Sequence, residues 1–153
     1  MKATPIKRHI ALQGLSRDHH HGLLLAWKIR KGFSKNIPTE RMKNYVDWFF
    51  ETYLIPHFDL EEAHIFPVLG MEHEGVVRAL AEHRRLIRLY REQEDLHVVL
   101  TRIEEELEQH IRFEERQLFN EIQRVASPAQ LAKIKNMHQE TAFIENNADE
   151  FWR

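Results

Sequence analysis

The stretch that decides the fold is LHVVLTRIEEELEQHIRFEERQLFNEIQRV, residues 96–125. Its core-type positions recur three or four residues apart, at Leu100, Ile103, Leu107, His110, Glu114 and Leu118. Residues with this spacing share one face of an α-helix, and such a stripe is typical of a helix packed in a bundle. A histidine and a glutamate occupy two positions of this core-facing stripe.

The same periodicity predicts three further core helices, over residues 16–31, 39–66 and 74–91. Ser16 and Thr39 are the expected N-caps, and Pro56 is expected to bend the second helix because it removes a backbone donor. No alternating β-branched run predicts a strand. We therefore expect an all-α protein, folded as an antiparallel four-helix up-and-down bundle because short connections favour antiparallel neighbours.

An additional C-terminal helix is expected over about residues 128–148, with Ser127 as its N-cap and Pro128 in its first turn. The whole chain, residues 1–153, is predicted to form one domain with the bundle core at about residues 12–126. The apolar tail Phe151-Trp152 is expected to dock on the bundle or on a second subunit. A homodimer through the C-terminal segment is therefore a further expectation.

The composition narrows the chemistry. The chain has 153 residues, enough for a core without disulfides, and it contains no cysteine. Zinc fingers, iron–sulfur clusters and thiol nucleophiles are thereby excluded, so any metal must be held by His, Asp or Glu. The net charge of -2, with both signs interspersed, gives no footprint for nucleic acid. No segment is apolar enough for a signal peptide or a membrane span, so we expect a cytoplasmic protein with no membrane partner.

Two His-x-x-x-Glu motifs point to a metal site, His57 with Glu61 and His110 with Glu114. Residues four apart on a helix differ by about 40° in direction and ~6 Å in height, so both side chains can reach one cation. One such motif alone is more often an exposed ion pair. His19 and His83, however, replace apolar residues on two other helices, and six polar groups in core positions are costly to bury unless paired or bound to a cation.

The predicted metal ligands are therefore His19, His57, Glu61, His83, His110 and Glu114. His20 takes the place of His19 if the helix is rotated by one residue. His9, His73, His97 and His138 are interpreted as surface or capping residues because they lie near predicted helix ends or far from the site. Imidazole and carboxylate donors suit iron, manganese or zinc.

These motifs, in this order, resemble the hemerythrin-like family, also called the HHE cation-binding domain. The matching pieces are residues 16–20, His57–Glu62 followed by 65–67, 81–84 and His110–Glu115, and the likeness spans about residues 12–122. The resemblance implies a bundle with an oxo- or hydroxo-bridged pair of iron ions. It implies His19, His57, His83 and His110 as terminal ligands, with Glu61 and Glu114 as bridges.

The chain departs from the family's oxygen carriers at Ala79, where they have a further histidine one turn before the helix-three ligand. A missing imidazole is expected to leave an open coordination position, which favours sensing or redox chemistry over reversible oxygen carriage. The leading hypothesis is a protein that binds or senses O2 or nitric oxide, or that handles iron. The alternatives are a di-iron redox enzyme that reduces peroxide or oxidises ferrous iron, and a zinc-bound or metal-free interaction bundle.

Overall fold

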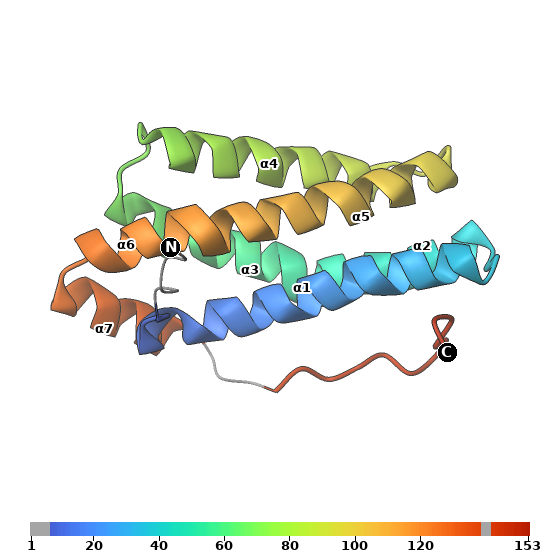
Figure 1. Cartoon of the computed structure of the whole chain (residues 1–153), viewed down its shortest axis with the longest axis horizontal. Coiled ribbons are helices and arrows are strands. Elements are labelled where there is room, and N and C mark those ends of the chain that lie inside the picture. Colours follow the sequence, from blue (N-terminus) through green and yellow to red (C-terminus); the bar gives the residue numbers. More distant parts are fainter. Residues whose placement is uncertain (1–6, 139–141) are drawn as a thin grey trace, which may run out of the picture.

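The fold is all-helical, as predicted. The structure is a computed structural model, and it describes residues 7–138 and 142–153. Its long helices lie side by side in a bundle (Figure 1). In chain order the elements are α1 (Ile10–Ser34), α2 (Thr39–Phe49), the π-helix η1 (Phe50–Leu54), α3 (Ile55–Leu60), the π-helix η2 (Glu61–Ile65), the 3-10 helix η3 (Phe66–Val68), α4 (Glu74–Arg91), α5 (Leu96–Phe113), the π-helix η4 (Glu114–Leu118), α6 (Phe119–Val125) and α7 (Pro128–Met137).

Helix α1 begins earlier than predicted, at Ile10 and not at Ser16. Its N-cap is His9, whose ring accepts a hydrogen bond from the Ala11 backbone N–H at 3.0 Å. The Ser16 hydroxyl points away from the backbone and donates to Glu115 across the bundle. The N-cap of α2 is Pro38, one residue before the predicted Thr39, and it makes no side-chain capping bond. Helix α4 spans the predicted residues 74–91.

Two of the predicted helices are continuous but contain π-helical turns. Residues 39–68 form one helical run in which η1 immediately precedes the turn with Pro56. A π turn adds one residue to the helix and shifts its hydrogen-bond ladder, here next to the residue that cannot donate. The predicted distortion at Pro56 therefore takes the form of a π turn. Residues 96–125 form the second run, interrupted by η4.

The C-terminal helix is shorter than predicted. Ser127 caps it with a complete capping box to Gln130, as expected, but α7 ends at Met137. The predicted extension to residue 148 is wrong for residues 142–148, which are not helical, and residues 139–141 lie outside the described part of the chain. Residues 142–153, the C-terminal strap, run alongside α1 (Figure 1). The strap is held by side chains and not by a backbone ladder: Glu145 accepts from Lys28 at 2.5 Å, and Asp149 pairs with Arg41 at 2.7 Å.

The aromatic tail docks on its own bundle, the first of the two predicted alternatives. Phe151 and Trp152 are buried, with 2% and 8% of their surface exposed. The Trp152 ring meets Tyr45 edge-on with centroids 4.9 Å apart, and the Lys28 ammonium lies 4.2 Å from its centre. The tail thus closes the apolar core between α1 and α2.

Trp152→Ala is expected to lower the free energy of unfolding by about 3 kcal/mol, since it removes a buried aromatic ring and its cation–π contact. Urea unfolding followed by far-UV circular dichroism measures the change. Arg153→Ala is the matched control, because Arg153 is exposed and its loss should stay within ~0.5 kcal/mol. Equal stability of the two variants would show that the tail does not contribute to the core.

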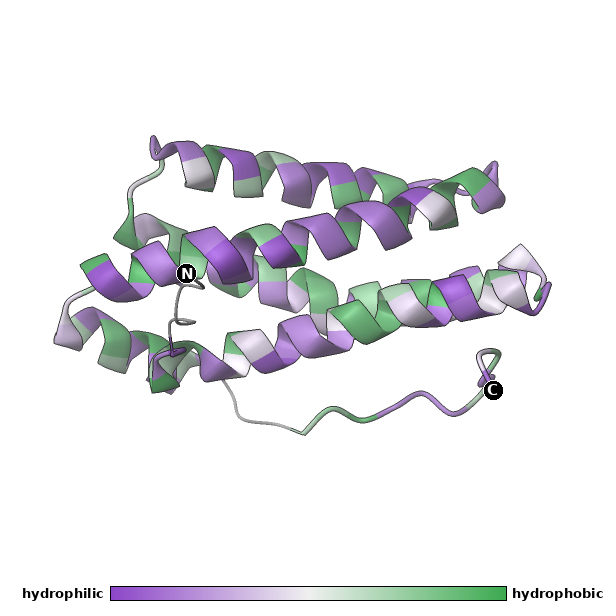
Figure 2. Ribbon diagram, in the orientation of Figure 1, coloured by the Kyte–Doolittle hydropathy of each residue, from purple (hydrophilic) through white to green (hydrophobic). Residues whose placement is uncertain are grey.

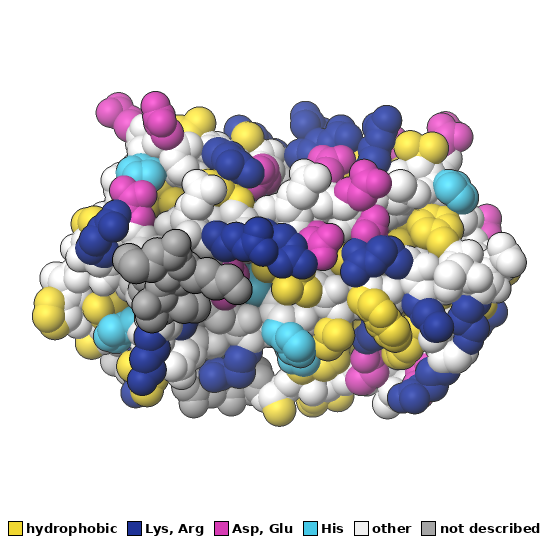
Figure 3. All heavy atoms as spheres, viewed as in Figure 1, with side chains coloured by type: hydrophobic (Ala, Val, Ile, Leu, Met, Phe, Trp, Pro, Cys, Tyr) yellow, Lys and Arg dark blue, Asp and Glu magenta, His cyan; other side chains and the backbone are white. Residues whose placement is uncertain are grey.

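The core has two apolar clusters, and the predicted metal ligands lie between them. The first cluster includes Leu25, Phe50, Leu86 and Leu100, and the second includes Leu12, Phe66, Val76 and Phe119. Hydrophilic and hydrophobic residues alternate along the helices, as expected of amphipathic helices in a bundle (Figure 2). On the face shown in Figure 3, basic and acidic side chains are interspersed. In the described part of the chain, no helix combines the length and apolarity needed to cross a bilayer.

Candidate metal centre

All six predicted ligands come together in the interior. Their exposed fractions are 3% for His19, 4% for His57, 1% for His83 and His110, and 0% for both Glu61 and Glu114. His19 comes from α1, His57 and Glu61 from the run 39–68, His83 from α4, and His110 and Glu114 from the run 96–125. His20, the alternative to His19, lies exposed and contacts the ring of His21.

The six side chains form two overlapping groups of four. His19, His57, Glu61 and Glu114 can place one ligand atom each within 4.8 Å of one another. His83 and His110 do the same with the same two glutamates. Each half of the centre therefore has two imidazoles of its own, whereas both carboxylates are shared. This arrangement is suited to two cations bridged by Glu61 and Glu114.

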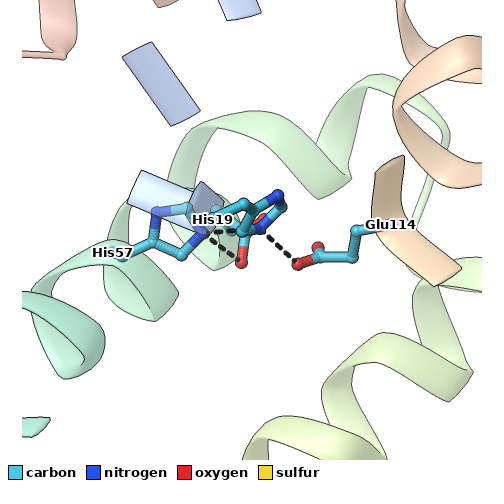
Figure 4. Close-up of side chains that lie close together, drawn as sticks. His19, His57 and Glu114 are labelled. Carbon is cyan, nitrogen blue, oxygen red and sulfur yellow. Dashed lines mark hydrogen bonds and ion pairs between the residues drawn. The ribbon is translucent and has the colours of Figure 1, made fainter. Parts of the chain in front are cut away.

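The imidazoles direct their Nε2 atoms toward the shared carboxylates. His19 Nε2 lies 3.1 Å from Glu114 Oε1 and 3.1 Å from His57 Nε2, so it stands between the two (Figure 4). On the other side, His83 Nε2 lies 3.1 Å from Glu61 Oε1 and His110 Nε2 lies 2.9 Å from Glu114 Oε1. The same nitrogen of each ring thus faces the centre.

The Nδ1 atoms face a second ring of four carboxylates that we did not predict. Asp18 lies 2.9 Å from His57, Glu62 lies 2.8 Å from His83, Glu82 lies 2.8 Å from His110 and Glu115 lies 3.4 Å from His19. A carboxylate beside Nδ1 keeps a proton on that atom, orients the ring and leaves the Nε2 lone pair free for a metal. The first three contacts are hydrogen bonds, and the fourth is a longer ion-pair contact.

These outer carboxylates had a signal in the sequence, because each is the neighbour of a ligand. Asp18 precedes His19, Glu82 precedes His83, and Glu62 and Glu115 follow the two shared glutamates. Adjacent helical residues differ by about 100° in direction, so one of each pair faces the centre while the other faces a neighbouring helix. The pairing is also regular: the acid before one ligand histidine holds the next ligand histidine along the chain, Asp18 for His57 and Glu82 for His110.

Both shared glutamates begin a π-helix, η2 at Glu61 and η4 at Glu114. In a π-helix the backbone N–H of residue i+5 donates a hydrogen bond to the carbonyl of residue i, so residue i+5 lies one turn above residue i. These residues are Phe66 and Phe119, which donate to the carbonyls of Glu61 and Glu114. Their rings pack on the ligand histidines, Phe119 on His19 with centroids 5.1 Å apart and Phe66 on His83 at 5.5 Å. The π turns therefore place a carboxylate and its aromatic cover on one face.

The polar atoms at the centre fit a cation. Both oxygens of Glu61, one oxygen of Glu114, and Nε2 of His83 and of His110 are buried without a hydrogen-bond partner among the described residues. Such atoms are costly to bury alone, and all of them are ligand atoms for a divalent or trivalent metal. A donor set of imidazole nitrogens and carboxylate oxygens, with no thiolate, suits iron, manganese or zinc.

Charge balance in the metal-free centre is provided by protons. Burial opposes a charge on His57, but the carboxylates of Glu61 and Asp18 outweigh it and hold its pKa well above the ordinary 6.5. His110 is likewise buried, and the charge of Glu114 raises its pKa to about 10. Burial alone would raise the pKa of Glu114, yet the charge of His110, whose Nε2 lies 2.9 Å away, and the hydrogen bond of His19 hold it well below 4.5. Metal ions would thus replace imidazole protons, so binding should release protons.

The metal-free protein is expected to lose stability as pH rises above 6.5. A raised histidine pKa stabilises the folded state fully below 6.5, and this contribution disappears as pH passes the folded value, about 10 for His110. Glu114 acts in the opposite direction below 4.5, because its lowered pKa stabilises the fold only while it is ionised. Urea unfolding of the metal-free protein at about pH 6 and about pH 9 should differ by a few kcal/mol, since one pKa unit corresponds to about 1.4 kcal/mol. A metal-free protein as stable at the higher pH would contradict the charge assignment.

The two halves of the centre differ in access. Phe58, which follows His57, stacks on His83 with centroids 3.8 Å apart and covers that half. The equivalent residue after His110 is Ile111, and it lines a cavity of about 640 Å³ that reaches His19 and His57. Ala79, which we expected to leave an open position, is fully buried in the second apolar cluster and does not line this cavity. The open side therefore lies at the other half of the centre.

Of the four histidines interpreted as surface or capping residues, one also has an unexpected contact near the site. His9 and His73 cap α1 and α4, and His97 is exposed in the first turn of α5, as interpreted from the sequence. His138 is different, because its Nε2 lies 2.9 Å from the oxygen of Asp18 that also faces His57. His138 is the C-cap of α7, so its interpretation as a capping residue is confirmed, but its side chain has a contact near the site that we did not predict. Because α7 ends at Met137, its C-cap His138 lies against Gly14 of α1, one turn from Asp18.

Searches against protein-family models, curated proteins and solved structures found no match to this chain. The assignment of the site therefore depends on its own geometry.

Proposed function

We propose that this chain is a hemerythrin-like protein that holds two iron ions in the centre and uses them to bind or sense O2 or nitric oxide, or to handle iron. One observation carries the proposal: two groups of four buried ligand atoms share Glu61 and Glu114. The outer carboxylates support it, since three of the four ligand rings donate to one in a hydrogen bond that frees Nε2. Bound iron would supply reversible one-electron chemistry, and manganese or zinc suits the same donors.

The arrangement of the helices supports the same proposal. Successive core helices meet the two apolar clusters in opposite order: α1 runs from Leu12 to Leu25, whereas the run 39–68 passes from Phe50 to Phe66. This alternation is what an antiparallel four-helix up-and-down bundle requires. In such a bundle each helix contributes metal ligands near the middle of the core, and the apolar clusters at both ends of the core exclude water from them.

Metal quantification with optical spectra tests the proposal. The protein is reduced without oxygen, loaded with ferrous iron, freed of unbound metal and then exposed to O2 or nitric oxide. Two iron ions per chain, with a new absorption band from a bridged or nitrosyl species, are expected. Retention of iron with no spectral change on exposure to O2 or nitric oxide would contradict binding of these ligands. Selective retention of zinc would favour the alternative of a zinc-bound interaction bundle.

The cavity beside His19 and His57 favours a second candidate, reduction of peroxide. Reduction of one hydrogen peroxide to two waters takes two electrons and two protons, so an external reductant must be supplied. Ile111→Phe is expected to fill the cavity and lower peroxide turnover by the iron-loaded protein while the iron content stays at the wild-type value. Turnover no faster than that of free iron would eliminate this candidate.

A further inference from the structure

We infer that His138, the C-cap of α7, is a positioning residue for the half of the metal centre formed by His19 and His57. It acts through Asp18. The inference rests on the proposed function, and it assigns to His138 a part in the metal site that none of the ligand motifs indicates.

Asp18 joins two imidazoles through one oxygen. Oδ2 lies 2.9 Å from His57 Nδ1 and 2.9 Å from His138 Nε2. A carboxylate oxygen can accept two hydrogen bonds, so both nitrogens donate: His57 from Nδ1, which leaves its Nε2 for the metal, and His138 from Nε2. Asp18 itself is one-third exposed, with 34% of its side-chain surface accessible. Without a second partner its carboxylate would be free to turn toward water.

The helix is shaped to receive His138. Gly14 lies one turn before Asp18 on α1, and a Cβ atom at Gly14 would stand 2.5 Å from His138 Nδ1. Glycine inside a helix is less favourable than alanine, and here it opens the space that the imidazole occupies. Leu131 and Ile134 of α7 pack into the second apolar cluster with Leu12 and Leu15, which sets the position of the residue that follows α7.

The equivalent carboxylate on the other half has a different support. Glu82 accepts from Arg78, four residues earlier on the same helix and half-exposed, so its position is set locally. Asp18 is instead tied to a residue 120 positions away. The two halves of the centre share Glu61 and Glu114, and each half has two outer carboxylates of its own, but only the His19 and His57 half has an outer carboxylate bound to His138. That half is the one beside the cavity, whose wall includes Met137, His138 and Phe143.

Two substitutions separate the hydrogen bond from the packing. His138→Phe keeps a ring of similar size against Gly14 but removes the donor. His138→Gln replaces Nε2 with an amide N–H in a similar place, so it should rescue the bond to Asp18. Arg78→Ala is the matched control on the other half, and it should leave the His19 and His57 half unchanged.

Zinc is the probe, because a diamagnetic ion allows imidazole N–H protons to be observed by NMR. In the wild type and in His138→Gln, the His57 Nδ1–H of the zinc-loaded protein should be protected from exchange with water. In His138→Phe this proton should exchange at least tenfold faster. One of the two zinc ions should also bind about tenfold more weakly, which is the lower end of the roughly 10- to 100-fold range for loss of a residue that supports a metal ligand. A titration monitored by calorimetry resolves the two binding steps.

The outcomes distinguish this inference from the proposed function. A wild-type protein that binds no metal would overturn both. A wild type with two zinc ions, together with a His138→Phe protein of unchanged affinity and unchanged His57 exchange, would overturn the role of His138 alone. Failure of His138→Gln to restore the protection lost in His138→Phe would equally reject it, since a purely structural effect of the ring would remain.

Discussion

Glu61→Ala should remove both metal ions from the chain and not one. Its carboxylate belongs to both groups of ligand atoms, whereas each histidine belongs to one. We expect the affinity for both ions to fall by more than about 100-fold, beyond the range for loss of an outer-shell partner, because a direct and shared ligand is lost. Metal content per chain after loading and gel filtration measures the effect. His83→Ala is the comparison and should lose one ion preferentially.

Folding must be controlled in this experiment, because Glu61 is fully buried beside imidazoles. Glu61→Gln keeps the shape of the side chain and removes its charge, so it should fold with an unchanged far-UV circular dichroism spectrum and still fail to bind metal tightly. Glu62→Ala changes the adjacent residue, which lies 2.8 Å from the outer nitrogen of His83, Nδ1, and belongs to neither group of four ligand atoms. It should weaken one ion by roughly 10- to 100-fold. A Glu61→Gln protein that holds two ions at wild-type affinity would refute a shared role for this carboxylate.

Removal of the metals is expected to cause the largest loss of stability in this protein. Each site contributes about 4 kcal/mol when free metal is at 1,000 times its dissociation constant. Two sites together correspond to a fall in melting temperature of roughly 15 to 30 °C, at about 2–4 °C per kcal/mol for a chain of this size. Differential scanning calorimetry before and after chelation measures this difference.

The pH dependence gives this experiment an internal control. Metal binding releases imidazole protons, so the stabilisation by metal should grow as pH rises from about 6 to about 8, while the metal-free protein becomes less stable. Glu61→Gln should unfold at the same temperature with and without added metal. A wild-type protein indifferent to metal at every pH in this range would leave the six buried groups as a purely structural network, which is the metal-free alternative.

The internal repetition of the site explains why substitutions at equivalent positions should differ in effect. Asp18, His57 and Glu61 repeat as Glu82, His110 and Glu114, and each set has its own π turn. The two halves differ where Phe58 in one set corresponds to Ile111 in the other, and in the contact of His138 with Asp18. Phe58 stacks on His83 in one half, whereas Ile111 at the equivalent position lines a cavity in the other half, which also depends on His138. Reactivity toward an external ligand is therefore expected at the His19 and His57 half.

The sequence by itself determined the helical class, the location of five helical regions though not the start of the first or the end of the last, and the set of six side chains that the structure brings together. It could do so because the helical period is local: His57 and Glu61, or His110 and Glu114, must share a face once their helix forms. The placement of His19 over His20 followed from the same phase argument, since Leu15 and Leu23 already define the buried side.

The tertiary structure alone decided what surrounds these ligands. The partner of each Nδ1, the stacking of Phe58 on His83 and the contact of His138 with Asp18 join residues 21 to 120 positions apart, and no period of the sequence relates such residues. The tertiary structure also decided that α7 ends at Met137. Phe143, which continues the apolar pattern of α7, instead packs on His21 of α1 and Phe49 of α2 as part of the non-helical strap. Local periodicity thus fixes which side chains face inward, whereas contacts between distant helices decide how those side chains are held.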